Sequence, residues 1–266
     1  VLTGSNMPPE AVCAALAEGG LGFVRVTVGE LLGYPQERIR SGTARDLQGL
    51  CFDPLSVLLI ENDRPLASAP LTAGLPDEAF DRAGAPMTKR EVRAVSLAQM
   101  DLRPADVVWD VGAGTGSVSV ECALLCRLGR VFAVERDAGA CEGIAHNREK
   151  FGVWHLQVVP GEAPEVLSAL PAPDRVFIGG SGARLREILQ TVRKANPAAR
   201  VVINAITLET LAQALAALAA PDFEHLEVTQ ISATRARPVG AYHMMTAQNP
   251  VFILAADGAA GEGSGA

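Results

Sequence analysis

Residues 107–121 constrain the possible folds of this chain more than any other stretch. Residues 107–111 form a short apolar run interrupted only by Asp110, which is typical of a buried parallel strand. Gly112, Gly114 and Gly116 follow at alternate positions, and apolar residues then return in helical register. A strand, a glycine-rich turn and a helix start bring backbone N–H groups and a positive dipole end to one point. The stretch therefore predicts a ligand site where glycine lets the ligand approach the backbone.

The spacing of the glycines distinguishes two kinds of ligand. The dinucleotide fingerprint Gly-x-Gly-x-x-Gly needs a third glycine where this chain has Ser117. An Asp two residues before Gly-x-Gly-x-Gly resembles instead the first motif of Rossmann-like S-adenosylmethionine methyltransferases. The resemblance implies that Asp110 orients the loop or meets the ammonium group of that cofactor, and that the loop passes close to its carboxylate. A plain tight turn is the alternative, but such a turn rarely needs three glycines and an Asp.

The next predicted strand, residues 130–135, ends in a carboxylate. Glu135 lies 21 residues after Gly114 (135 − 114), where doubly wound folds place an acidic residue that holds ribose hydroxyls. An ordinary surface Glu at a strand end is the alternative interpretation. Because Glu135 follows the glycine loop in the chain, we favour the ribose-binding role for it.

Composition excludes several classes of protein. With 266 residues and 48% hydrophobic content, the chain can bury one sizeable core plus a smaller unit. A formal net charge of −7 gives no global field that would attract nucleic acid, and no apolar run reaches the length of a membrane span. Five cysteines without CxxC spacing suggest reduced thiols in a cytoplasmic protein. We expect Cys122 and Cys126 to be small core residues, and we expect no metal site.

The pattern divides the chain into four parts. Residues 1–65 predict a small β-α-β-α-β piece, with strands at 1–4, 23–28 and 55–60 and helices at 8–18 and 43–50. Because this piece is too small to close a good core, we expect that the chain begins partway into a longer protein or that an upstream domain has been lost. Residues 66–76 predict a linker, residues 77–257 the ligand-binding domain, and residues 258–266 a disordered tail.

The alternation of strands and helices continues after Glu135. Strands are predicted at 155–159, 175–178, 201–205, 225–232 and 250–255, and helices at 138–150, 185–194 and 208–219. Five βα units followed by a hairpin resemble the seven-stranded methyltransferase sheet, in which the last strand is antiparallel. The predicted fold class is therefore α/β, a Rossmann-like class I methyltransferase preceded by a small α/β fragment.

Ligands of open α/β sheets bind at the carboxyl ends of the strands. This rule nominates a rim made of residues 112–117, Glu135, 161–163, 179–182 and Asn204. Residues 161–163 would lie along the adenine, although Glu162 is equally well explained as a loop residue. Residues 179–182 lie where this fold brings the substrate to the methyl group. They contain no Asn-Pro-Pro-aromatic tetrad, which argues against methylation of an exocyclic base amine.

A further cofactor candidate precedes the glycine loop. Thr88 and Glu91 have the spacing of a capping box, which predicts a helix start. A helix N-terminus beside the glycine loop would face the same cleft, so Thr88 can also contact the cofactor.

Five motifs together resemble the decarboxylating precorrin-6Y methyltransferases of cobalamin synthesis. They are Ala-Pro-Met-Thr-Lys-Arg-Glu-Val-Arg at 85–93, the stretch 110–121, Gly-Glu-Ala-Pro at 161–164, Asn-Ala-Ile-Thr-Leu-Glu at 204–209 and Asn-Pro-Val at 249–251. Residues from about 76 to 257 resemble the C-terminal half of that family, which methylates carbon 15 and removes carbon dioxide from an acetate side chain. The first 60-odd residues resemble the end of its N-terminal half, a tetrapyrrole methylase acting at carbon 5. The cofactor-binding front of that half is missing, so carbon-5 activity is not expected.

The resemblance implies S-adenosylmethionine contacts at Thr88, 112–116, Glu135 and Ala163, and a homo-oligomer, often a tetramer. Combined with the strand-end rule, the predicted cofactor residues are Thr88, Asp110, Gly112, Ala113, Gly114, Thr115, Gly116, Ser117, Glu135, Gly161, Glu162, Ala163 and Gly179.

A polycarboxylate tetrapyrrole would require local positive charge in this acidic chain. Arg235 and Arg237 follow the sixth predicted strand, on a loop expected to overhang the cleft, and Lys89 lies near the first helix. Since Arg suits bidentate carboxylate contacts, our hypothesis is that Arg235 or Arg237 clamps a substrate carboxylate. Solvated surface charge is the alternative for each. Asn204 and His243 complete the substrate-side candidates, and the sequence identifies no acid or base.

The expected chemistry depends on alignment more than on a strong base. A methyl sulfonium is already activated, and proximity and orientation can supply about 7–11 kcal/mol of a barrier. Two other functions stay open: a methyltransferase of this fold acting on tRNA adenine or a protein carboxylate, and a non-catalytic half of a fused enzyme. The acidic balance counts against RNA, and the intact motif counts against loss of catalysis. Of the functions considered, a dehydrogenase is the least favoured.

Overall fold

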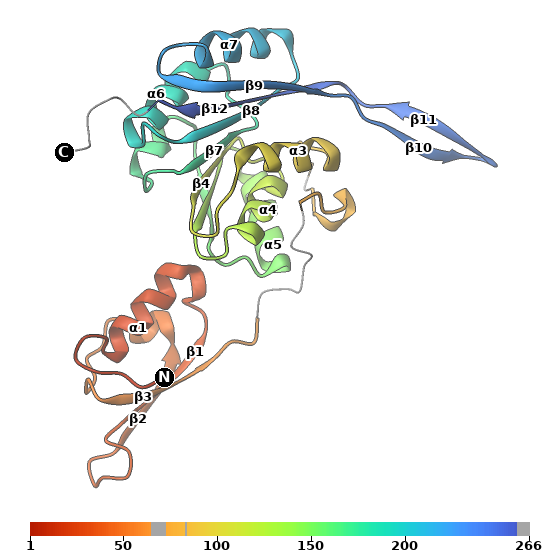
Figure 1. Cartoon of the computed structure of the whole chain (residues 1–266). Coiled ribbons are helices and arrows are strands. Elements are labelled where there is room, and N and C mark those ends of the chain that lie inside the picture. Colours follow the sequence, from red (N-terminus) through yellow and green to blue (C-terminus); the bar gives the residue numbers. More distant parts are fainter. Residues whose placement is uncertain (65–72, 83, 260–266) are drawn as a thin grey trace. The chain divides into compact units, whose positions relative to one another are not determined.

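The computed structural model describes residues 1–64, 73–82 and 84–259, and the chain divides into two compact units (Figure 1). One unit comprises Val1–Ser68 with Gly152–His155, and the other Ala69–Phe151 with Leu156–Ala266. Residues 66–72 of the predicted linker and 260–266 of the predicted tail lie outside the described residues. No helix in the described part of the chain is long and apolar enough to cross a bilayer.

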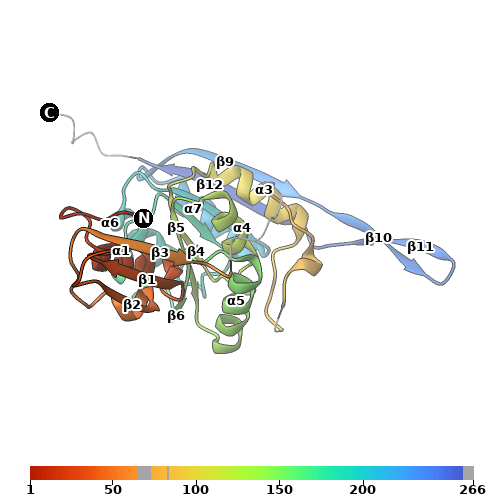
Figure 2. The same ribbon diagram turned by 90° about the horizontal axis from the view of Figure 1, so that it is seen from below.

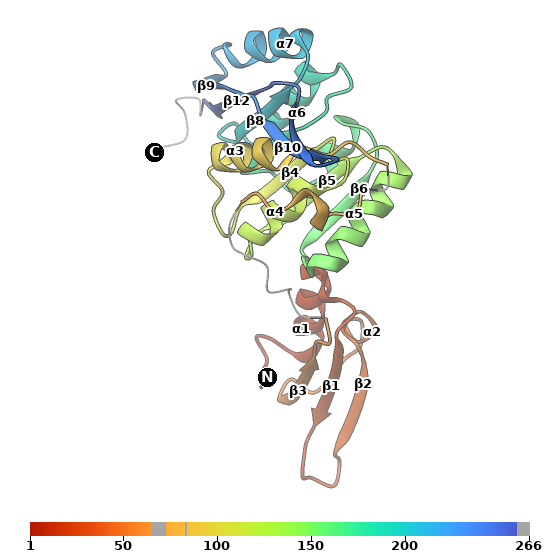
Figure 3. The same cartoon turned by 90° about the vertical axis from the view of Figure 1, so that its right-hand side faces the viewer.

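The N-terminal unit is a three-stranded antiparallel sheet with short helices. Strands β1 (Arg25–Glu30), β2 (Arg38–Thr43) and β3 (Ser56–Glu61) lie in the order β2-β1-β3 (Figure 3). Helix α1 (Pro9–Leu16) begins at a proline, which suits the first helical position, and α2 is Ala44–Leu47. Cys13, Val26, Val28 and Leu58 form the core of this unit.

The predicted β-α-β-α-β order of this unit is wrong in two places. The expected first strand amounts to isolated bridges from Leu2 to Val57 and from Gly4 to Met7. Strand β2 was not predicted, because its sequence is mostly polar and its side chains are exposed or half-buried. Only backbone pairing with β1 makes it a strand, and such pairing leaves no hydrophobic alternation in the sequence.

The second unit is built on a seven-stranded sheet. Its strands are β4 (Val107–Val111), β5 (Arg130–Glu135), β6 (Leu156–Pro160), β7 (Arg175–Ile178), β8 (Arg200–Ala205), β9 (Phe223–Ile231) and β12 (Val251–Gly258). They lie in the order β6-β5-β4-β7-β8-β12-β9. The first five are parallel, whereas β12 runs antiparallel to both β8 and β9. The predicted fold class and its antiparallel last strand are therefore confirmed.

Helices cover both faces of this sheet, which explains the nearly continuous apolar run in β4. Trp109 and Val111 pack with Ile188, Val192 and Leu218 on the face of α6 (Leu185–Ala195) and α7 (Leu208–Leu218). Asp110, one position along, points to the opposite face, where Ser119 of α4 (Ser117–Leu125) contacts it. The remaining helices are α3 (Arg90–Met100), α5 (Ala138–Phe151) and 3₁₀ turns at Asp77–Ala79 and Glu165–Ala169.

A two-stranded arm extends from the sheet between β9 and β12. Strands β10 (Thr234–Val239) and β11 (Tyr242–Ala247) pair antiparallel and project beyond the helices (Figures 1 and 2). Gly240, with φ +60°, starts the two-residue turn between them. The predicted loop at Arg235 and Arg237 is therefore wrong. Because nearly every side chain of the arm is exposed, the alternation that marks a half-buried strand is absent.

The capping box predicted at Thr88 is also wrong. Helix α3 has Lys89 at its N-cap with no side-chain cap, so Thr88 lies one position too early. The Glu91 carboxylate, which would complete the box, instead accepts hydrogen bonds from Arg235.

Candidate active site

The carboxyl ends of the parallel strands border a cavity of about 530 Å³. This volume lies within the range of small-molecule sites, about 300–1,000 Å³. The walls come from the loops after β4, β5, β6, β7 and β8 and from the segment before α3. The cavity is lined by Pro86, Met87, Thr88, Val111, Gly112, Ala113, Gly114, Val118, Val134, Glu135, Arg136, Asp137, Gly161, Glu162, Ala163, Phe177, Gly179, Gly180, Ser181, Gly182, Ile188 and Ile206.

The glycine loop touches two neighbouring loops without room for a side chain. Gly112 has φ +73°, and a Cβ there would lie 2.6 Å from the carbonyl oxygen of Gly180. Gly114 has φ +55°, and its Cβ would lie 2.5 Å from the carbonyl oxygen of Pro86. The Thr115 N–H donates to that same Pro86 oxygen at 3.3 Å. Glycine is therefore required here by the packing of the protein itself, as well as by any ligand that approaches the backbone.

Glu135 presents an oriented carboxylate to the cavity. Its Oε2 accepts from the Gly114 N–H at 2.9 Å, and its Oε1 accepts from the Arg136 and Asp137 N–H groups at 2.9 and 3.0 Å. A carboxylate has about four acceptor positions, so Oε2 keeps capacity for a hydroxyl donor.

Asp110 is completely buried beneath the loop. Ser119 Oγ donates to its Oδ2, while its Oδ1 has no hydrogen-bond partner in the part of the chain that the structure describes. Burial raises the pKa of Asp110 to about 7; the hydrogen bond from Ser119 opposes this shift, and the charge of Glu135 adds to it. Asp110 therefore links β4 to the start of α4, the two elements that flank the glycine loop, and titrates near neutral pH.

The structure brings most of the predicted cofactor residues to one cavity. Thr88, Gly112, Ala113, Gly114, Glu135, Gly161, Glu162, Ala163 and Gly179 line it. Asp110, Thr115, Gly116 and Ser117 belong to the same turn but do not line the cavity.

The predicted substrate-side residues lie outside the cavity lining. The Asn204 Oδ1 accepts from Ser96 Oγ at 3.0 Å, and Lys89 occupies the N-cap position of α3 without a capping hydrogen bond from its side chain. Arg237 and His243 are exposed on the arm, and Arg235 is ion-paired to Glu91 and Asp77.

Several lining residues were not nominated from the sequence, among them Arg136, Asp137 and Ile206. Arg136 and Asp137 directly follow Glu135. They would have been predicted if the rule that ligands bind at the carboxyl ends of strands had been applied to the whole loop after β5. Ile206 follows β8 and is 64% exposed. An apolar side chain exposed at the edge of a cavity is a signal that only the structure supplies.

The charged residues that line the cavity are mostly acidic. Three of them are acidic, and the one basic residue among the described lining residues, Arg136, is paired with Glu162 at 3.1 Å. The cavity therefore suits a cationic ligand.

The strand order and the glycine loop with its following carboxylate define a Rossmann-like methyltransferase fold. Residues 78–257 match the family described as precorrin methyltransferase domain. The chain therefore belongs to this family of methyltransferases.

Relatives and solved structures agree with this membership. A protein of Pyrobaculum calidifontis, named probable cobalt-precorrin-6B C(15)-methyltransferase (decarboxylating), is 47% identical over 70% of this chain and 96% of its own length. The precorrin-6Y C(5,15)-methyltransferase [decarboxylating] of Sinorhizobium is 36% identical over 78% of this chain and 51% of its own. The crystal structure of precorrin-6y C5,15-methyltransferase from Geobacter metallireducens superposes with a TM-score of 0.67 at 39% identity, covering 72% of this chain and 100% of that one.

The family match begins at residue 78. The predicted likeness of residues 1–65 to the end of a tetrapyrrole methylase therefore stays a prediction.

The buried carboxyl of Asp110 predicts a defined pH dependence of stability. Unfolded, this group loses its proton near pH 3.8, whereas folded it keeps the proton to about pH 7. Between these values the folded state binds more protons, so rising pH favours unfolding. We expect the free energy of unfolding of the wild type, relative to Asp110→Asn, to fall across this window and to level off above it.

Urea denaturation from pH 4 to 9 measures this difference, in which the other titrating groups cancel. A Ser119→Ala variant should extend the decline to higher pH, because the hydrogen bond that lowers the pKa is removed. A difference that is constant, or that grows with pH, would contradict the prediction.

Proposed function

We propose that this chain is an S-adenosylmethionine-dependent C-methyltransferase of cobalamin biosynthesis. Its substrate would be a corrin precursor of the precorrin-6 type, methylated at carbon 15 with loss of carbon dioxide from an acetate side chain. The observation that carries the proposal is the cavity between the glycine loop and the Glu135 carboxylate, in a domain that matches the precorrin methyltransferase family.

The cavity fits S-adenosylmethionine in shape and charge. The close backbone approach at Gly112–Gly114 suits the amino-acid end, and the free acceptor position of Glu135 suits a ribose hydroxyl. Gly161, Glu162 and Ala163 form the wall proposed for the adenine. Bound there, the cofactor would supply a methyl group already activated by its positive sulfonium, whose charge the acidic lining favours.

The residues of the chain align the substrate and exclude water more than they move protons. Ile206 offers an exposed apolar contact to a flat macrocycle at the edge of the cavity. In decarboxylation the bond between the side-chain carbon and the carboxylate carbon would break. Carbon dioxide would leave, the conjugated ring would take up the electron pair, and a proton from solvent would replace the lost carboxylate. In methyl transfer an electron pair of carbon 15 would form the new bond to the methyl group while the bond from that methyl group to the sulfonium sulfur breaks, its electron pair leaving on the sulfur of the neutral thioether. The conjugated substrate itself would therefore supply and accept the electron density.

A labelling assay tests this function. With methyl-labelled S-adenosylmethionine and an isolated precorrin-6-type substrate, we expect label in the ring together with released carbon dioxide. Label in tRNA or protein with none in the macrocycle would refute the proposed substrate.

Calorimetry tests the cofactor site. Glu135→Gln should weaken binding of S-adenosylmethionine about tenfold, the effect of losing one hydrogen bond to a charged group. Absence of cofactor binding by the wild type would refute the whole proposal.

We further propose that Arg237 contacts a carboxylate of the substrate. Arg235 is committed to Glu91 and Asp77. Arg237, two positions along β10, is exposed and makes no ion pair with any residue in the described part of the chain. Three further candidates for substrate contact remain, which are Asn204, His243 and Lys89, the residue after the lining residue Thr88.

Arg237→Gln should raise the KM for the macrocycle about tenfold, since a charge-assisted hydrogen bond is lost, while the Kd for S-adenosylmethionine stays unchanged. Steady-state kinetics with varied substrate measures this. An unchanged KM, also in the Arg235→Gln/Arg237→Gln double variant, would remove both arginines from the substrate site.

We also propose that the chain forms a homo-oligomer, such as a tetramer, through the β10–β11 arm. The arm exposes Val239, Tyr242, Met244 and Met245, with 41–78% of each residue accessible, and apolar residues gathered on a projecting element favour association. Replacing residues 233–248 with a short turn is compatible with the sheet, because Ile231 and Val251 remain paired. Sedimentation velocity should show an oligomer for the wild type and a monomer for the shortened chain. A wild type that is monomeric at micromolar concentration would contradict the proposal.

A cytoplasmic location is proposed on the five free cysteines. Recovery of the protein in a secreted fraction would contradict it.

A further inference from the structure

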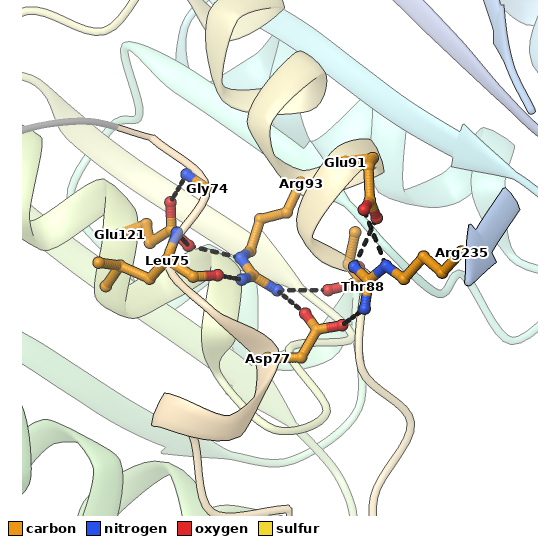
Figure 4. Close-up of polar contacts among 8 residues, drawn as sticks. All are labelled: Gly74, Leu75, Asp77, Thr88, Glu91, Arg93, Glu121 and Arg235. Carbon is orange, nitrogen blue, oxygen red and sulfur yellow. Dashed lines mark hydrogen bonds and ion pairs between the residues drawn. The ribbon is translucent and has the colours of Figure 1, made fainter. Parts of the chain in front are cut away.

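Arg93, in the first turn of α3, is the centre of a buried polar network (Figure 4). Its side chain is fully buried. The guanidinium donates to Glu121 Oε1, to the Thr88 carbonyl and to the Leu75 carbonyl, each at 2.5 Å, and it lies 3.3 Å from Asp77 Oδ1. Glu121 in turn accepts from the Gly74 and Leu75 N–H groups. One guanidinium thus joins α3, α4 and the irregular segment that precedes them.

Asp77 extends this network to the arm. Its second oxygen accepts from Arg235 Nη1 at 3.0 Å, while Arg235 also forms two hydrogen bonds to Glu91, at 2.8 and 2.6 Å (Figure 4). Arg235 is the second residue of β10, where the arm leaves the sheet. Asp77 is buried, whereas the Arg235 side chain is 37% exposed. The base of the arm and Arg93 therefore share one buried carboxylate.

The other side of the network touches the cavity. Residues 86–88 line the cavity and are held at both ends, by Thr115 N–H on the Pro86 carbonyl and by Arg93 on the Thr88 carbonyl. The Pro86 carbonyl is also the atom that packs against Gly114. A change in the position of Arg93 would therefore move the wall of the cavity that lies against the glycine loop.

We propose that Arg93 and Arg235 are positioning residues that hold residues 86–88 against the glycine loop, so that S-adenosylmethionine binding depends on the base of the β10–β11 arm. The inference rests on the proposed function, because it concerns the cofactor of that site. Neither arginine lines the cavity; both act through Asp77 and the Thr88 carbonyl. Without Arg235, Arg93 is the one remaining cationic partner of Asp77 in this network. The same Arg93 nitrogen donates to the Thr88 carbonyl, so a stronger pairing with Asp77 would weaken the contact with Thr88.

The test uses Arg235→Gln in the full chain, because Arg235 is half-buried and its loss is less harmful to folding than loss of the buried Arg93. The matched control is Arg200→Gln. Arg200 also forms a partly buried ion pair, with Asp257 at 2.8 Å, but it begins β8 and so lies at the opposite end of the parallel strands from the cavity. Both variants should lose thermal stability. A change at the cavity that only Arg235→Gln shows therefore cannot result from general destabilisation.

Calorimetry measures the Kd for S-adenosylmethionine, and hydrogen exchange measures protection of the Thr115 amide without any ligand. Arg235→Gln should raise the Kd about tenfold and should lower the protection of the Thr115 amide. Arg200→Gln should leave the Kd unchanged, and it should lower Thr115 protection by no more than its loss of global stability requires. Arg235→Lys should recover part of the affinity, since its ammonium can still pair with Asp77.

Equal effects of the two variants, or an unchanged Kd and Thr115 protection in Arg235→Gln, would overturn the inference. If the wild type binds no S-adenosylmethionine, the proposed function fails, and Thr115 exchange alone then decides whether Arg235 positions residues 86–88.

Discussion

The contact of backbone against backbone at Gly112 and Gly114 is the constraint on which the site depends. Three loops that are far apart in the sequence meet there, those containing Pro86, Gly114 and Gly180. A side chain at either glycine would separate them, since the nearest backbone atoms would lie within 2.6 Å of the added carbon. The same turn also gives the Gly114 N–H to Glu135 and covers the buried Asp110. The shape of the cavity and the orientation of its carboxylate thus follow from one turn.

Polar side chains replace secondary structure in the segment that precedes α3. Between residues 73 and 88 the described chain has only a short 3₁₀ turn, so its backbone groups need other partners. Glu121 accepts two of its N–H groups, and Arg93 donates to two of its carbonyls. Buried charges are tolerated when they are paired and hydrogen-bonded in this way. An irregular segment can therefore form a fixed wall of a binding site.

The sequence predicted the parts of this protein that are buried and local. All seven strands of the large sheet were predicted. In the central strands two-sided burial leaves apolar runs such as that of β4, whereas β9 is half-buried or exposed along its length and has no such run. The glycine loop and Glu135 were predicted to share one site from their spacing along the chain, and both line the cavity. Strand β2 and the arm were not predicted, since exposed strands carry no such pattern. The partners of Arg235 could not be predicted either, because Asp77 and Glu91 are 158 and 144 residues away and nothing local distinguishes a paired arginine from a solvated one.

The place of β12 in the sheet also bears on how the domain folds. It is the last strand in the described part of the chain, yet it lies between β8 and β9 rather than at an edge. During synthesis β8 therefore has an uncovered hydrogen-bonding edge, and β9 lacks its neighbour, until residues 251–258 have left the ribosome. Open strand edges and contacts of long sequence separation slow folding and invite association between unfinished chains. Completion of the sheet is thus a late event that the order of the strands imposes on the growing polypeptide.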